Sequence, residues 1–242
     1  MSKLPKAPLV EIVFELRWSV ENKSDLMDAE YLYGDIFAEI KNKYPQRERI
    51  LPIEIPVELT INKPVYRYRA NKNGYPLVQI GPGLLTLNTT ANLYEWNVFF
   101  NDAKELTKTF IKIFKPEKEK KINLSLLYLD FFPFDFNNGD VSKFINENLN
   151  ITIEQSFVKN VKYPKEINIA YSFDIEQGEL KVSLQKGTYK TQNEGLLLQS
   201  RINRTPIQPE TNLITEWLNN SHGICSNLFK ELTKGQLYES FK

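Results

Sequence analysis

The sequence has little of the side-chain chemistry on which most catalytic and metal sites depend. Among its 242 residues there is one histidine, His222, and one cysteine, Cys225. A lone cysteine excludes an intramolecular disulfide and a thiol redox pair. A metal held by His222 and Cys225 would take its further ligands from carboxylates, and no spacing of acidic residues indicates them. We therefore expect no metal, no cofactor and a reducing, cytoplasmic location.

The chain also lacks an excess of charge and a long apolar run. Lysine and arginine number 31 against 30 acidic residues, so no overall field favours nucleic acid or an anionic membrane. No apolar stretch approaches the ~20 residues that cross a bilayer. Residues 1–16 superficially suggest a signal peptide, but Glu11 and Glu15 interrupt the apolar run and no cleavage site follows. A strand is the better interpretation, and we expect no membrane partner.

Familiar catalytic motifs are missing as well. A nucleophilic triad would have to combine His222 with Cys225 or a serine, yet Cys225 lies on the same predicted helix and no G-x-S-x-G elbow occurs. Residues 81–83, Gly-Pro-Gly, could suggest a phosphate loop, but the proline removes a backbone donor and a strand pattern follows. A hairpin turn fits these residues better. The sequence therefore leans away from an enzyme.

What the sequence has in quantity is apolar and aromatic residues in alternating runs. Hydrophobic residues make up 41% of the chain, with 15 Phe and 12 Tyr, enough for a self-sufficient core. Alternation of apolar and polar side chains predicts strands. The predicted strands are residues 10–18, 53–61, 65–70, 77–80, 84–88, 122–132, 167–173, 180–186 and 196–202. Tight turns at residues 71–74, 81–83 and 176–178 indicate antiparallel pairing.

Helical spacing of apolar residues predicts several helices. They are residues 26–44, 103–114, 141–149 and 211–233. Residues 94–100 fit either a further strand or the start of a helix. Residues 219–223 weaken the middle of the last helix, so the sequence allows a kink or a break there.

The charged stretch KPEKEKK, residues 115–121, is the most linker-like part of the chain. It divides the sequence into an N-terminal half, residues 1–116, and a C-terminal half, residues 117–242. Each half reads as strand, helix, meandering strands and long helix, an element order that resembles that of the TATA-binding protein. The predicted fold class is α+β, with antiparallel sheets covered by helices. Two pseudo-repeated halves and one continuous domain with an irregular sheet are the alternatives.

Four arginines are candidates for a binding surface. Arg67 and Arg69 project from one face of their predicted strand, and Arg201 and Arg204 lie at the end of a later strand. Arginines on a sheet surface bind phosphates or the carboxylates of a partner. If the two strands share a groove, the sheet carries a basic stripe; otherwise these residues form ordinary surface salt bridges.

Asp130, Tyr128 and His222 are the other candidate site residues. Asp130 shares a face with Tyr128 and apolar neighbours in a very apolar strand, and a buried carboxylate demands an arginine or N–H partner. A structural ion pair and a functional site are both consistent with this pattern. His222 either packs around an irregularity of the last helix or belongs to a site. Glu11 and Glu15 lie about 13 Å apart along their strand, too far to act as an acid/base pair alone.

Several segments together resemble an uncharacterised, sporadically distributed family of bacterial proteins of about this length. They are PLVEIVFELRW at the start, the block YRYRANKNGYPLVQIGPGLLTLN with Trp96 and Phe99 following it, the strand INLSLLYLDFF, and the closing residues His222, Ser226, Phe229, Leu232 and Thr233. Members of this family are associated with an R-Y-I-N-like core in the middle strand, where this chain has residues 127–130, Leu-Tyr-Leu-Asp. The resemblance implies a bacterial cytoplasmic protein from a mobile or defence-type locus, with a protein partner from the same locus. No activity comes with the family.

The sequence thus leaves three functions to compare. The first is a non-enzymatic binding or assembly protein that holds a partner, or a second copy of itself, on an exposed sheet face or the last helix. The second is nucleic-acid binding through the arginines and tyrosines of the sheet. The third is an enzyme of unfamiliar type centred on Asp130, Tyr128 or His222. If those three side chains converge in one pocket, the enzyme is favoured over the non-enzymatic binding protein.

Overall fold

The described strands form one antiparallel sheet, whereas the sequence predicts antiparallel strands in sheets and leaves a single continuous sheet as an alternative. In the computed structural model, which describes residues 4–115, 120–158, 163–190 and 193–242, nine strands lie in the order β2-β3-β4-β5-β1-β6-β9-β8-β7. Together with the helices, this sheet confirms the α+β fold class. The strands are β1 (Leu9–Trp18), β2 (Gln46–Arg49), β3 (Tyr66–Arg69), β4 (Leu77–Gly81), β5 (Leu84–Thr90), β6 (Ile122–Pro133), β7 (Asn168–Ile175), β8 (Gly178–Tyr189) and β9 (Asn193–Ile207).

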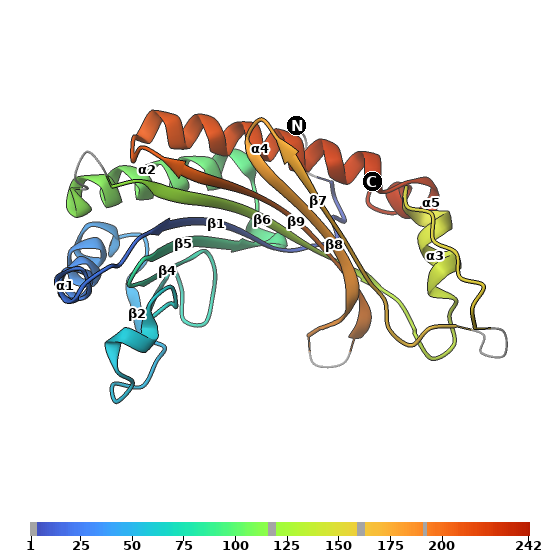
Figure 1. The fold of residues 1–242 in the computed structure, drawn as a ribbon, viewed down its shortest axis with the longest axis horizontal. Coiled ribbons are helices and arrows are strands. Elements are labelled where there is room, and N and C mark those ends of the chain that lie inside the picture. The colour runs from blue at the N-terminus through green and yellow to red at the C-terminus, as the bar shows by residue number, and fades with distance from the viewer. Residues whose placement is uncertain (1–3, 116–119, 159–162, 191–192) are drawn as a thin grey trace.

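Two long helices lie side by side along one face of the arched sheet (Figure 1). They are α2 (Trp96–Phe114) and α4 (Thr211–Leu232), and α4 contacts β6 and β9. We call the side of the sheet turned toward them the helix face, and the other side the open face. The remaining helical elements are α1 (Lys23–Ile40), α3 (Val141–Asn148), α5 (Gly235–Glu239) and the short 3-10 helices η1 (Val57–Thr60) and η2 (Ala91–Leu93). None of the described helices is both long and apolar enough to cross a bilayer.

The alternation within β1 explains which side the helices cover. Ile12, Phe14 and Leu16 on the helix face are at most 1% exposed, whereas Glu11 and Glu15 on the open face are only partly buried. Burying a side chain such as Phe14 contributes roughly 1.5–3 kcal/mol. A shift of one residue in the strand pairing would place these apolar side chains on the open face, so the burial fixes the register.

The two halves of the chain meet at the centre of this sheet, where β1 pairs with β6. Outward from that pair, the first half runs β1-β5-β4-β3-β2 and the second runs β6-β9-β8-β7. Each half thus begins with its central strand and pairs it with its last strand. The expected boundary between residues 116 and 117 lies outside the described residues, and an internal repeat stays a prediction.

The strand predicted at residues 53–61 is wrong. Residues 57–60 form η1 instead, and Pro56 precedes it as the N-cap with φ −52°. Prolines at positions 52 and 56 remove backbone donors that a ladder would need, which outweighs the alternating pattern. The outermost strand of this half is β2, whose four residues, QRER, are all exposed and therefore show no apolar alternation.

The helix boundaries and the middle of the last helix also differ from expectation. Helix α1 begins after Asn22, whose side chain accepts a hydrogen bond from the Asp25 N–H, and it ends at Ile40 before the predicted residue 44. Residues 96–100 are the start of α2. Helix α4 continues through residues 219–223 without a break, because Leu218, Ser221 and Cys225 pack against the sheet along this stretch.

Candidate functional site

A cavity of about 140 Å³ lies between the helix face and α4, close to the centre of the molecule. Its walls come from five segments: the chain leading into β1, the residues between η2 and α2, the strands β6 and β9, and α4. We call this cavity the central pocket. It is lined by Leu4, Ala7, Pro8, Leu9, Tyr94, Glu95, Trp96, Tyr128, Asp130, Ser200, His222, Cys225, Ser226, Phe229 and Lys230.

Three of the sequence-predicted site residues meet in the central pocket. Tyr128 and Asp130 point from β6 into it, and His222 reaches it from α4. The alternation of β6 places both of its residues on the helix face, since they share parity with the buried Leu124 and Leu126. The imidazole and the carboxylate therefore line one cavity although 92 positions separate them in the chain.

A chain of hydrogen bonds joins Tyr94, Tyr128 of β6 and His222 of α4 in the pocket. The Tyr128 hydroxyl lies 2.6 Å from Nδ1 of His222, and the Tyr94 hydroxyl lies 3.0 Å from that of Tyr128. Burial raises the pKa of Tyr128 well above its usual range, so this hydroxyl keeps its proton. Trp96 stacks on the imidazole with ring centroids 3.7 Å apart.

His222 is neutral in this environment. Burial, aided by the positive charge of Lys230, lowers the pKa of the imidazole to about 4. In the neutral ring one nitrogen carries a proton and the other accepts, so Nδ1 can bond the Tyr128 hydroxyl in either tautomer. His222 therefore orients Tyr128 and carries no charge near pH 7.

Asp130 is the unusual member of the pocket. Its side chain is 5% exposed, and among the described residues we find no hydrogen bond and no ion pair to its carboxylate. Burial alone raises the pKa of this carboxyl to about 7. The arginine or N–H partner that we expected from the sequence is thus missing from the part of the chain that the structure describes.

Small side chains leave the space that the pocket occupies. Ser200 on β9 lies directly opposite Tyr128 in the strand pairing and is 3% exposed. On α4, Cys225 and Ser226 face the same space between the larger His222 and Phe229. Longer apolar residues at these positions would fill the cavity, so its volume follows from the choice of small residues on both walls.

Neither thiol chemistry nor a metal centre is apparent at this site. Burial, with a further contribution from the nearby Asp130, raises the pKa of Cys225 to about 12, so its thiol is unreactive near neutral pH. Within the described ranges, no three His, Cys, Asp or Glu side chains are grouped as metal ligands.

Most residues that line the pocket are not among the candidate site residues, and they include Tyr94, Trp96, Ser200 and Phe229. Tyr94 and Trp96 belong to a segment whose pattern fits both a strand and a helix start. Ser200 carried a readable signal, because it interrupts the apolar alternation of Leu196, Leu198 and Ile202. Asp130 interrupts β6 in the same way, and two such interruptions on facing strands mark a polar site in a core.

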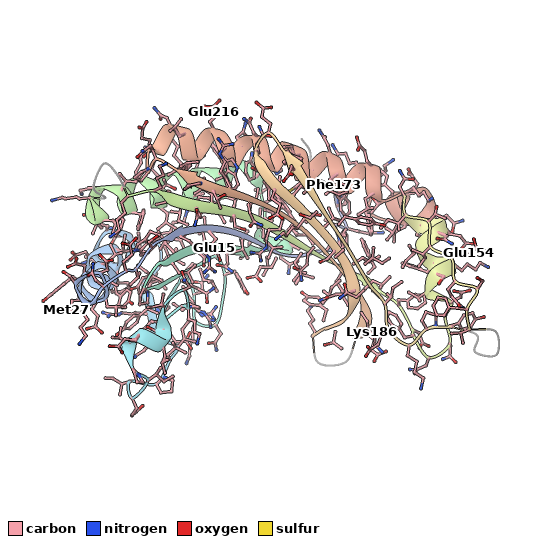
Figure 2. All side chains as sticks on the ribbon, viewed as in Figure 1. Glu15, Met27, Glu154, Phe173, Lys186 and Glu216 are labelled. Atoms are coloured by element: carbon pink, nitrogen blue, oxygen red, sulfur yellow. The ribbon has the colours of Figure 1, made fainter. Side chains whose placement is uncertain are left out.

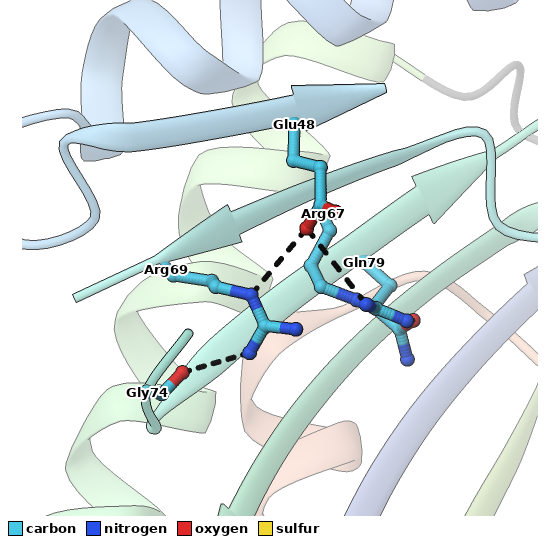
Figure 3. A network of polar contacts seen from close by, with 5 residues as sticks. All are labelled: Glu48, Arg67, Arg69, Gly74 and Gln79. Atoms are coloured by element: carbon cyan, nitrogen blue, oxygen red, sulfur yellow. Dashed lines mark hydrogen bonds and ion pairs between the residues drawn. The ribbon is translucent and has the colours of Figure 1, made fainter. Parts of the chain in front are cut away.

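The arginines of β3 do not take part in the central pocket. Arg67 and Arg69 lie on the open face, where the Glu48 carboxylate is 3.8 Å and 3.5 Å from their respective guanidinium nitrogens (Figure 3). Arg67 also donates to Oε1 of Gln79, and Arg69 donates to the Gly74 carbonyl. Both side chains are therefore held by neighbours on the sheet, as the salt-bridge alternative predicts.

Arg201 and Arg204 lie far from that pair and point in opposite directions. Arg201 is on the open face, and five strand spacings from β3 to β9 correspond to about 24 Å. Arg204 pairs with Leu124 of the helix face and donates to the Glu176 carbonyl. Glu11 and Glu15 occupy the open face between these sites, so the described residues do not form a continuous basic stripe.

The central pocket thus offers one neutral imidazole, two tyrosine hydroxyls and one carboxyl that has no partner among the described residues, within aromatic walls. Such a set can hold a small ligand by hydrogen bonds and charge, with apolar contact on several sides. The family likeness of the sequence stays a prediction, since comparisons of the chain with protein-family models, curated proteins and solved structures found no match.

Proposed function

We propose that this protein binds a compact organic cation, such as a protonated amine, in the central pocket, with Asp130 as its counter-ion. The observation that carries the proposal is the buried Asp130 carboxylate, which lines a cavity and has no donor among the described residues. A carboxylate in such a place is costly unless an N–H group or a cation satisfies it. A positively charged ligand would supply the partner that the Asp130 carboxylate lacks among the described residues.

The walls of the pocket suit an organic cation better than a hydrated metal ion. Tyr94, Trp96, Tyr128 and Phe229 line it with aromatic rings, whose faces attract positive charge. The exposed rim adds a second carboxylate, Glu95, and also Lys230. Aromatic surface around one buried carboxylate is a common arrangement for substituted ammonium groups.

The volume of the central pocket limits the ligand to a small molecule. A dry cavity of about 150 Å³ accepts benzene, and the central pocket measures about 140 Å³. A single aromatic ring or a short alkyl chain with one amine is therefore the largest ligand that fits without rearrangement.

Binding is better supported than catalysis at this site. An enzyme of acyl transfer would need an activated nucleophile, and the Cys225 thiol has its pKa raised to about 12. The neutral His222 is occupied at Nδ1 by Tyr128, so it does not activate a serine through that atom. Asp130, with a pKa of about 7, is the one lining group whose protonation changes near neutral pH among those described.

Three probes of matched size test the proposal by isothermal titration calorimetry. Benzylamine carries the positive charge, benzyl alcohol is its neutral counterpart, and benzoate carries a negative charge. We expect benzylamine to bind the wild-type protein at least about tenfold more tightly than benzyl alcohol, and benzoate to bind more weakly than both. Equal binding of the three probes would contradict a role for charge.

Two variants locate the binding site. Asp130→Asn keeps the shape of the side chain and removes the charge, so it should abolish the preference for benzylamine. Glu95→Gln is the matched control, because Glu95 lies at the exposed rim of the same pocket and its charge is screened by water. An unchanged benzylamine affinity in Asp130→Asn would overturn the proposal.

A second function, the binding of a partner protein, is favoured by a different part of the sheet. The edge strand β7 carries Tyr171 and Phe173, which are 45% and 50% exposed. Large exposed apolar side chains of this kind are typical of interface anchors. Nucleic-acid binding lacks such an observation, because Arg67 and Arg69 are engaged by Glu48 and acidic residues separate them from Arg201.

A further inference from the structure

The two edges of the sheet differ in how well they are protected. The edge strand β2 has four residues, of which three are charged, and charged side chains on a short strand discourage pairing with another chain. The opposite edge, β7, has eight residues with one charge, Asp174. Its side chains are exposed or only partly buried along its whole length. The strand β7 therefore has the properties of an edge that accepts a further strand.

The hydrogen bonds to β8 determine which backbone groups of β7 remain available. The Lys186 N–H donates to the Ile167 carbonyl, so residue 167 faces β8. Because the two backbone groups of a residue point the same way in an antiparallel strand, alternate residues from Ile169 to Ile175 also face β8. The N–H and C=O groups of Asn168, Ala170, Ser172 and Asp174 point outward, and the sheet order places no described strand beyond them.

We propose that β7 pairs with β7 of a second copy of this chain, so that the two sheets join into one continuous antiparallel sheet. An antiparallel pair centred on Tyr171 sets Asn168 opposite Asp174 of the other copy and Ala170 opposite Ser172. All of these residues point their backbone groups outward, so every one of them exchanges hydrogen bonds in this register. No like charges face each other across it.

The side chains of the same register support a second copy over an unrelated strand. Tyr171 then lies opposite Tyr171 of the other copy, and Phe173 lies opposite Ile169. In one chain, the rings of Tyr171 and Phe173 already stack with centroids 6.1 Å apart on the helix face. Phe173, which Figure 2 labels, is 50% exposed there. Two copies thus form a continuous row of apolar and aromatic side chains, which stabilises cross-strand pairs.

The overall charge of the chain does not oppose this association. The formal net charge is +1, so two copies approach without strong mutual repulsion. A twofold axis through the Tyr171 pair also closes the assembly at two chains, because the other edge of each sheet is the charged strand β2.

Sedimentation analysis of the full chain over a range of concentrations tests the proposal. We expect a monomer–dimer equilibrium for the wild-type protein. Ala170→Pro removes an outward N–H without touching the β8 ladder, and it should weaken dimerisation at least about tenfold. Ala170→Ser keeps that N–H and is the matched control. A wild-type protein that is monomeric at every concentration, or a dimer unaffected by Ala170→Pro, would overturn the proposal.

Cysteine cross-linking tests the register independently of affinity. In Tyr171→Cys, the two introduced thiols lie directly opposite each other in a pair that exchanges no backbone hydrogen bonds, within reach of a disulfide. In Ser172→Cys the thiols are offset by two residues and on the other face, so cross-linking should be slower. The native Cys225 is 3% exposed and does not compete. Faster cross-linking of Ser172→Cys than of Tyr171→Cys would exclude this register. Circular dichroism of each variant shows that the fold is retained.

Discussion

The hydroxyl of Tyr128 lies 2.6 Å from Nδ1 of His222, and this contact joins the central strand β6 to the helix α4 that covers it. It holds the imidazole in place beside Asp130 in the central pocket, where burial keeps the ring neutral. Removal of the hydroxyl therefore affects both stability and the electrostatics of the site.

Tyr128→Phe should lower the free energy of unfolding by about 1–3 kcal/mol, because it leaves a buried imidazole nitrogen without its hydrogen-bond partner. Chemical denaturation measures this loss. Tyr31→Phe is the matched control, since it removes the same hydroxyl from a side chain that is 71% exposed. A loss no greater than that of the control would show that the contact adds nothing to stability.

Asp130→Asn should stabilise the protein at high pH relative to the wild type. The folded carboxyl has its pKa raised to about 7 from 3.8, so its contribution to stability is complete below about pH 4 and is lost as the pH rises through about 7. The amide cannot ionise and avoids this loss, which amounts to at most about 1.4 kcal/mol per pH unit. Urea denaturation at several pH values measures the difference.

The matched control for that series is Asp28→Asn, which changes an exposed carboxylate on α1. Its stability relative to the wild type should change less with pH than that of Asp130→Asn, because water screens an exposed charge. If Asp130→Asn keeps a constant difference from the wild type between about pH 5 and about pH 8, the carboxyl is not buried as described.

His222→Gln should change the pH dependence in the opposite direction. The pKa of the imidazole falls to about 4 in the folded protein from 6.5, so its contribution to stability is present above about pH 6.5 and is lost as the pH falls through about 4. The glutamine variant lacks this loss and should therefore gain stability relative to the wild type on acidification. A relative gain on raising the pH instead would contradict the neutral state of His222.

Glu48→Gln should increase the retention of the protein on a heparin column. The substitution frees Arg67 and Arg69 from the carboxylate that they share, and the freed guanidinium groups can bind sulfate. The wild-type protein should elute at low salt. Strong retention of the wild type, unchanged in Glu48→Gln, would revive the nucleic-acid alternative.

The sequence predicts the sheet well where one face of a strand is buried and the other is not. In β1 and β6 every second side chain is apolar, and burial of that row imposes the strand. The pattern does not reveal β2, because its four residues are all exposed and polar, so no apolar alternation marks the strand that pairs with β3. It misleads at residues 53–61, where prolines prevent a ladder despite the alternation.

The central pocket could be predicted only in part. The apolar neighbours of Asp130 indicate a buried carboxylate, but its distance from His222 in the chain gives no sign that β6 and α4 bring the two together. Asp130 and His222 come together because β6 pairs with β1 and β9, and this pairing places Asp130 on the side of the sheet that α4 covers. Ser200 lines the pocket because it lies opposite Tyr128 in the strand pairing. The sequence does not give the register of that pairing, so it does not predict this position.

The pH dependence of benzylamine binding tests the central claim most directly. Asp130 must be ionised to act as a counter-ion, and the pKa of its carboxyl in the free protein is about 7. The affinity measured by calorimetry should therefore fall about tenfold per pH unit below pH 7 and level off above it, while benzyl alcohol shows no such dependence. A benzylamine affinity that stays constant from about pH 5 to about pH 8, or that follows the same curve in Asp130→Asn, would contradict the account.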